Sequence, residues 1–264
     1  MADLTDATDL LRELGLSREA ILQHEALPFR GPPTAYLSGS LVEGLGNYGS
    51  DIDVFVIDGS WPRSVLTISR QRCRIGIRFH EHRRIDYEYW DPERVHQLAN
   101  RLNNLHVGER FVADSFLPEE EHFIHRLITG LALNDAAGLQ EWQSRFDSDL
   151  FRRFLTQQAV HRIDGALEDV WGMVDSADWD SALLRARDLV GLGADLWNHS
   201  HGSTNSAVKW RARLLALTDP SGTVHRRFWA LQNCEHPERE EGAVRAYVHK
   251  CAAFAEELVE EVQS

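Results

Sequence analysis

Two aspartates, Asp51 and Asp53, stand one residue apart at the start of the segment 51–56, whose other residues are all apolar. Side chains alternate along a β-strand, so both carboxylates share one face while Ile52 and Val54 serve the interior. Neighbouring carboxylates repel each other unless a cation lies between them. Carboxylate oxygens are good ligands of hard divalent cations, so the pair is a candidate metal site.

Four glycines, at positions 39, 44, 46 and 49, lie between a predicted strand at 34–38 and Asp51. Glycine allows positive φ values and lets the backbone come close to a ligand. Gly39 and Ser40 begin this loop, which can present backbone N–H groups and the Ser40 hydroxyl to phosphate oxygens. The sequence therefore predicts a phosphate-binding loop directly before the aspartates, with Ser50 at its end as a further contact.

A third carboxylate is needed if the site is to hold two divalent cations about 4 Å apart. The segment 84–90 alternates polar with apolar residues, which predicts a strand that carries Asp86 and Glu88 on one face. Asp86 is the expected third ligand, and Glu88 is the alternative that the spacing leaves open.

Together, Gly39-Ser40, Asp51-Ile52-Asp53 and Ile85-Asp86-Tyr87 resemble the pattern of the DNA polymerase β type of nucleotidyltransferase superfamily. The resemblance covers residues 34–90, about a fifth of the chain. It implies that the three aspartates bind two Mg²⁺ ions and that Gly39 and Ser40 touch the triphosphate of ATP or another nucleotide. It also implies that Asp86 is the candidate base.

The segment 195–211 holds a polar loop rich in Ser, Asn and Gly, followed by Lys209 and Trp210. This segment resembles the helical domain of small nucleotidyltransferases, including aminoglycoside-modifying relatives. The resemblance implies that Lys209 reaches a nucleotide phosphate. The chain has only one other lysine, Lys250, so a lysine at this position is uncommon for this composition.

The elements that must position these residues form two predicted domains. Amphipathic spacing over 8–27 predicts one or two short helices before the strand-rich segment, and Asp91-Pro92 predicts the start of another helix. Beyond Pro118 the spacing is helical, with helices expected at about 149–173, 178–199, 206–217, 221–233 and 238–262. We therefore predict an α+β fold: a nucleotidyltransferase head with a mixed β-sheet flanked by helices at 1–115, and an all-helical bundle at 116–264.

Charge and composition narrow the choice of partners. The net charge of −13 disfavours a long nucleic acid, whose binding needs a basic surface. A basic cluster between positions 70 and 84 is a local exception that could steer an anionic ligand. No apolar run is long enough to span a membrane, and the acidic N-terminus does not resemble a secretory signal. With three widely spaced cysteines, these features predict a cytoplasmic protein.

Three functions remain open at this point. The first is transfer of a nucleotide to a small hydroxylated acceptor, such as an antibiotic. The second is modification of a macromolecule, as in protein adenylylation, or synthesis of an oligonucleotide or cyclic nucleotide. The third is a nucleotide-binding regulator without turnover, which the presence of all three carboxylates disfavours. The sequence favours the first and leaves the acceptor, the nucleotide and the oligomeric state open.

Overall fold

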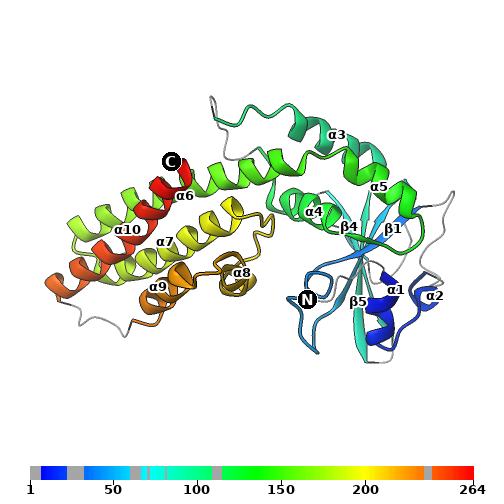
Figure 1. Cartoon of the computed structure of the whole chain (residues 1–264), viewed down its shortest axis with the longest axis horizontal. Helices are drawn as coiled ribbons and strands as arrows, with labels where there is room; N and C mark the ends of the chain where they lie inside the picture. Colours follow the sequence, from blue (N-terminus) through cyan, green and yellow to red (C-terminus); the bar gives the residue numbers. More distant parts are fainter. Residues whose placement is uncertain are drawn as a thin grey trace. The chain divides into compact units, whose positions relative to one another are not determined.

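A computed structural model describes residues 7–22, 33–59, 67–69, 72–80, 82–108, 115–234 and 240–264. The chain forms two compact units (Figure 1). Unit 1 comprises residues 1–105 and 116–148, and unit 2 comprises residues 106–115 and 149–264. Each unit is described by itself.

In the described part of unit 1, six strands form one mixed sheet in the order β3-β4-β5-β2-β1-β6. Their bounds are β1 Thr34–Ser38, β2 Ile52–Ile57, β3 Thr67–Ser69, β4 Arg74–His80, β5 Arg83–Trp90 and β6 Leu131–Ala132. Strands β2 and β5 are parallel neighbours, and every other pair of neighbours is antiparallel. The predicted α+β fold with a mixed sheet is confirmed.

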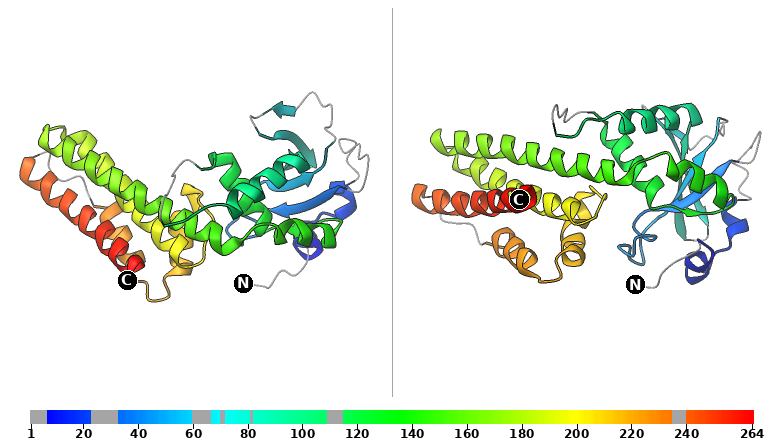
Figure 2. Two further views of the ribbon diagram at one scale, coloured as in Figure 1. Left: turned by 90° about the horizontal axis from the view of Figure 1, so that it is seen from above. Right: turned by 45° about the horizontal axis from the view of Figure 1, so that its top comes forward.

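Helices cover both faces of this sheet (Figure 2). Helices α1 (Ala7–Glu13) and α2 (Arg18–Leu22) bury Leu11 and Ile21 against the face that carries Val54 and Ile85. Helix α4 (Pro118–Ile128) lies on the opposite face, where the Phe123 ring stacks on that of Trp90 with centroids 4.0 Å apart. The predicted N-terminal helices are confirmed up to residue 22, and positions 23–27 lie outside the described residues.

Two further helices complete unit 1. Helix α3 (Pro92–Asn103) starts where the sequence predicts, because the Asp91 carboxylate accepts hydrogen bonds from the backbone of Glu93 and Arg94. Helix α5 (Ala136–Ser144) packs beside α3, with the rings of His96 and Trp142 4.8 Å apart.

The boundary between the units differs from the one expected at 115/116. Residues 116–148 belong to unit 1 because α4 covers the sheet and β6 extends it beside β1. The helical spacing after Pro118 predicts a helix with a buried face, but it does not indicate whether the sheet or the bundle covers that face.

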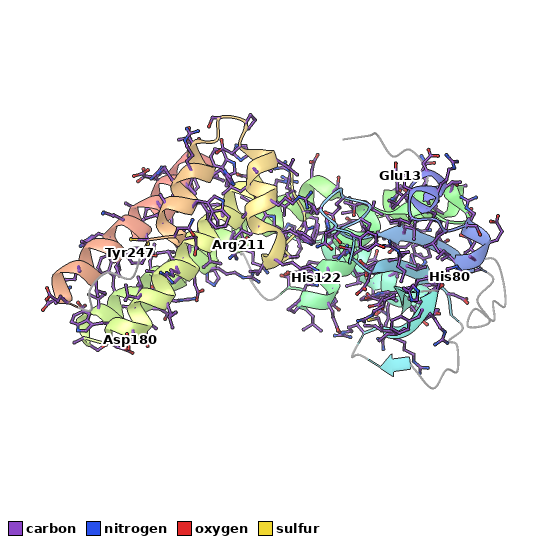
Figure 3. All side chains as sticks on the ribbon, turned by 90° about the horizontal axis from the view of Figure 1, so that it is seen from below. Glu13, His80, His122, Asp180, Arg211 and Tyr247 are labelled. Atoms are coloured by element: carbon purple, nitrogen blue, oxygen red, sulfur yellow. The ribbon has the colours of Figure 1, made fainter. Side chains whose placement is uncertain are left out.

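Unit 2 is all-helical in its described part, as predicted. Its elements are α6 Ser148–Asp175, α7 Trp179–Ser200, the 3₁₀ turn η1 Val208–Trp210, α8 Arg211–Thr218, α9 Thr223–Gln232 and α10 Glu241–Gln263. Helices α6, α7, α9 and α10 share one hydrophobic core. Arg211, labelled in Figure 3, ties α8 to α7 through two hydrogen bonds of 2.7 and 2.6 Å to Asp195. No helix among the described residues is both long and apolar enough to cross a bilayer.

Candidate functional site

The glycine-rich loop begins directly against Asp53. Gly39 follows β1 with a φ of +95°, and a Cβ atom at this position would overlap Oδ2 of Asp53 and lie 2.6 Å from Nη1 of Arg126. The carbonyl of the buried Ser40 accepts hydrogen bonds from the backbone of Leu45 and Gly46, at 2.8 and 2.6 Å. Only glycine therefore fits at position 39, and the loop is closed by its own backbone.

The parallel register of β2 and β5 sets the predicted acids side by side. Asp53 is the register partner of Asp86, and Asp51 precedes β2 by one residue on the same face. Their side chains are 42% (Asp51), 30% (Asp53) and 23% (Asp86) exposed, so all three are open to a ligand. This register places Asp53 and Asp86 side by side near the start of β2 and β5, with Asp51 directly before β2.

Glu88, the alternative third acid, has a different neighbourhood. Its register partner on β2 is Phe55, and its Oε1 accepts a 2.7 Å hydrogen bond from the indole of Trp90. Asp86 thus lies beside Asp53, whereas Glu88 lies two residues further along the strand and contacts Trp90.

Two arginines hold these acids. The Arg84 guanidinium donates two 2.7 Å hydrogen bonds to the two oxygens of Asp86, and its Nε lies 3.7 Å from Asp51. Arg126, from α4, lies 3.9 Å from Asp53 and 3.7 Å from Glu43. The hydrogen bond to Asp86 and that carboxylate's charge raise the pKa of Arg84, and the charges of Asp51 and Asp53 add to the effect. The three aspartates therefore already attract the positively charged guanidinium groups of two arginines.

The contacts of Arg84 and Arg126 with these acids are not predicted by the sequence pattern. Arg84 counted only as part of the basic cluster, although its position two residues before Asp86 puts both side chains on one strand face. Nothing in the local sequence marks Arg126, because α4 brings it to the site from far along the chain.

The donor set fits a divalent cation in chemistry and in backbone position, since it offers three carboxylates on adjacent strands. As the side chains stand, no three His, Cys, Asp or Glu groups within the described ranges converge tightly enough to hold a metal ion. In this arrangement Arg84 donates hydrogen bonds to both oxygens of Asp86. An ion bound by all three aspartates would compete with Arg84 for the oxygens of Asp86.

Ser50 and Lys209, the other two predicted nucleotide contacts, each contact a neighbouring part of the chain in this structure. The Ser50 hydroxyl accepts a 2.9 Å hydrogen bond from the backbone of Asn47, which closes the turn before Asp51. Lys209 lies in η1 of unit 2, with its ammonium 5.3 Å from the ring centroid of Trp210. The structure thus gathers Gly39, Ser40, Ser50 and the three aspartates in unit 1 and assigns Lys209 to unit 2.

The basic cluster at 70–84 divides into separate groups. Arg72 lies 3.4 Å from Glu120, and Arg78 donates to the carbonyl of Ile77. Arg83 and Arg84 lie at the start of β5, beside the aspartates. Arg70 is outside the described residues.

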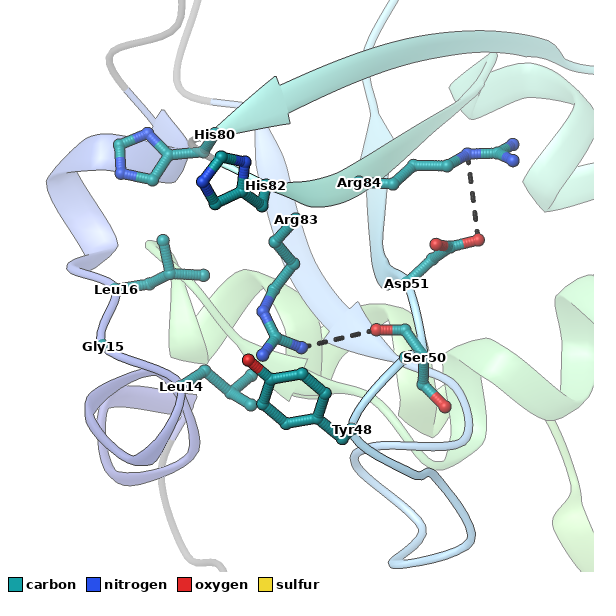
Figure 4. A pocket seen from close by; sticks show the side chains of 11 residues that line it. Leu14, Gly15, Leu16, Tyr48, Ser50, Asp51, His80, His82, Arg83 and Arg84 are labelled. Carbon is teal, nitrogen blue, oxygen red and sulfur yellow. Dashed lines mark hydrogen bonds and ion pairs between the residues drawn. The ribbon is translucent and has the colours of Figure 1, made fainter.

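A pocket of about 350 Å³ adjoins the acids at the edge where β2 and β5 begin (Figure 4). Its walls come from the turn after α1, the end of the glycine-rich loop and the turn between β4 and β5. Asp51 belongs to both the pocket and the acid group, so a molecule in this pocket lies directly beside the candidate metal ligands.

No protein-family model matches the sequence, and no curated protein matches it. Among solved structures, the backbone is similar to that of a nucleotidyltransferase-like protein from Exiguobacterium sibiricum, with 14% sequence identity and a TM-score of 0.49. The superposition covers 92% of this chain and 73% of that one. At this level of similarity, the functional conclusion depends on the geometry of the site.

Proposed function

We propose that this protein is a Mg²⁺-dependent nucleotidyltransferase that moves a nucleoside monophosphate, AMP from ATP as the first choice, to a hydroxyl of a small acceptor with release of pyrophosphate. The observation that carries the proposal is the pairing of Asp53 with Asp86 across parallel strands, with Asp51 at the same edge and Gly39 against Asp53. We also place the reaction in the cytoplasm, where its three free cysteines would stay reduced.

Asp51, Asp53 and Asp86 would hold two Mg²⁺ ions in this proposal. When bound, such ions polarise the acceptor oxygen and stabilise the departing pyrophosphate. Asp86 would release Arg84 as it takes up this role. It would also be the group that accepts the proton of the acceptor hydroxyl, since a general base must lie within hydrogen-bond reach of that proton.

The triphosphate would lie along the loop at Gly39 and Ser40. Positioning and electrostatics carry most of the catalysis in phosphoryl transfer, so donors that fix the phosphates matter most. Arg126 is such a donor, because its Nη1 is buried beside Gly39 and makes no hydrogen bond to the described residues. Lys209 and Ser50 are further proposed contacts to the nucleotide.

The experiment is incubation with each α-³²P-labelled nucleoside triphosphate and Mg²⁺, with small-molecule and protein fractions of a cell extract as acceptors. We expect label to move to a small molecule with the wild-type protein. The variants Asp51→Asn and Asp53→Asn should lose at least about a hundredfold in rate, because each removes a charged ligand of the ions. Asp58→Asn, at the other end of β2, is the matched control and should keep its activity.

Asp86→Asn and Glu88→Gln separate the two candidate third acids. Asp86→Asn should abolish transfer, whereas Glu88→Gln should keep most of it, because Glu88 faces Trp90. Circular dichroism should show native helix content in every variant. Full turnover by folded Asp51→Asn and Asp53→Asn proteins would refute the proposed function, and loss in Glu88→Gln alone would show that Asp86 is the wrong acid.

A further inference from the structure

The pocket beside Asp51 has the size of a site for a small molecule. Its volume of about 350 Å³ lies in the range of small-ligand pockets, roughly 300 to 1,000 Å³. Leu14 and Leu16 contribute apolar side chains to the lining, and His80, His82 and Arg83 contribute nitrogen-bearing ones (Figure 4). Gly39 and Ser40, the proposed triphosphate contacts, do not line it. Ser50, a further proposed contact to the nucleotide, does line the pocket, so the pocket adjoins the place proposed for the nucleotide.

Two arginines line this pocket although the whole chain is acidic. Among the described lining residues, Arg83 and Arg84 carry permanent positive charge and Asp51 alone carries a negative one. Arg84 is engaged by Asp86. Arg83 pairs with no carboxylate in the described part of the chain, and its one hydrogen bond is a 3.5 Å contact with the Ser50 carbonyl. Its guanidinium is thus available to an anionic ligand.

Tyr48 stands at the mouth of the pocket with 94% of its surface exposed. The guanidinium of Arg83 lies 5.7 Å from the centroid of its ring. The two side chains lie next to each other in Figure 4. An exposed aromatic ring, beside a guanidinium that pairs with no carboxylate among the described residues, can pack against a flat or apolar part of a ligand while the cation binds its charged group.

We infer that this pocket receives the acceptor and that the acceptor is a small phosphate monoester that also carries a hydroxyl group. The inference rests on the proposed function and deepens it. Arg83 would bind the phosphate, for which a planar guanidinium is well suited, and Asp51 brings the bound molecule beside the reacting centre. A polycationic antibiotic is the opposite in charge, and Arg83 would repel it.

The transfer balances without any other reactant. The acceptor hydroxyl oxygen forms a bond to the α-phosphorus of the nucleotide, and the bond from that phosphorus to the bridging oxygen of the β-phosphate breaks. Pyrophosphate leaves with the electron pair of that bond. The hydroxyl proton passes to Asp86 and then to water.

Binding is tested first, by calorimetry in EDTA, so that neither metal nor turnover is needed. The probes are glucose 6-phosphate, ribose 5-phosphate and AMP, each beside its uncharged parent (glucose, ribose and adenosine), with kanamycin as the polycation. We expect at least one phosphate probe to bind in preference to its parent and to kanamycin. Arg83→Gln should weaken that binding roughly ten- to a hundredfold, as expected for a hydrogen bond between charged groups. Arg74→Gln, an exposed position on β4 outside the pocket lining, should leave it unchanged.

Transfer of label from each α-³²P nucleotide to the same probes then separates the two proposals. Binding of no phosphate probe, equal binding by Arg83→Gln, or preference for kanamycin would overturn the inference. Label that moves to kanamycin or a neutral sugar, but to no phosphate monoester, would also overturn it and leave the nucleotidyltransferase function intact. Arg83-dependent binding without transfer to any acceptor would support an anion-binding pocket and count against the proposed function.

Discussion

Gly39→Ala should separate the glycine-rich loop from Asp53 and so test the arrangement of the site directly. Two independent effects act at this position. Its φ of +95° is one that residues with a Cβ rarely adopt, and the new Cβ would overlap Oδ2 of Asp53 and lie 2.6 Å from Nη1 of Arg126. Gly15→Ala is the matched control in the same unit, because its φ is +72° and no heavy atom lies within 4 Å of the added Cβ.

The two effects have different sizes. A positive φ costs alanine about 1 kcal/mol, so Gly15→Ala should lose about that much stability. Overpacking adds about 1–3 kcal/mol, so Gly39→Ala should lose about 3 kcal/mol in total. A displacement of Asp53 by about 1 Å would also lower the transfer rate by roughly a hundredfold, since misplaced catalytic groups lose the benefit of orientation.

Urea titration read by hydrogen exchange in β1 and β2 measures the stability of unit 1 without assuming that both units unfold together. Gly15→Ala serves as the control for stability only, because it lines the pocket beside Asp51. Equal losses in the two variants, or normal transfer by Gly39→Ala, would refute the close packing of Gly39 on Asp53.

Three further predictions follow from named contacts. Arg84→Gln removes the ion pair with Asp86 and should raise the affinity for Mn²⁺, used as a probe for Mg²⁺, about fivefold. The reason is that a partly exposed ion pair is worth up to about 1 kcal/mol. Unchanged or weaker Mn²⁺ binding by calorimetry would show that Arg84 does not compete with the ion for Asp86. Lys209→Ala should weaken binding of a nucleoside triphosphate roughly tenfold, with Lys250→Ala as control, and unchanged affinity would remove Lys209 from the site. Burial raises the pKa of Tyr87 to about 12, so its contribution to stability is complete below pH 10 and is lost as the pH rises from 10 to 12. Wild-type protein should therefore lose roughly 1 kcal/mol more than Tyr87→Phe in urea titrations between pH 9 and pH 11, and equal losses would contradict this assignment.

Local pattern was sufficient to predict the strands on which Asp53 and Asp86 lie. Alternation fixed the common face of Asp51 and Asp53, and the polar–apolar pattern of 84–90 placed Asp86 on a strand. The Asp91 cap and the helices of unit 2 also follow from short-range signals. These features depend on neighbours within one or two turns or strand repeats, which the sequence shows directly.

The rest of the site depends on contacts that short-range patterns do not encode. The bidentate pairing of Arg84 with Asp86 depends on side-chain rotamers, and Arg126 arrives on a helix far along the chain. Strand β6 has two residues, too few to show a period, yet its pairing with β1 places residues 116–148 in unit 1. The expected boundary at 115/116 therefore differs from the division at 148/149.

The pairing of β2 with β5 also has a consequence for folding fidelity. A slip of one residue in this register would turn Tyr87 outward and bury Asp86, at the cost of a charge without water. A slip of two residues in one direction would keep the alternation but set Asp53 opposite Glu88, and so would separate Asp53 from Asp86. A one-residue error in strand pairing is therefore destabilised by Asp86, one of the carboxylates that are proposed to act on the nucleotide.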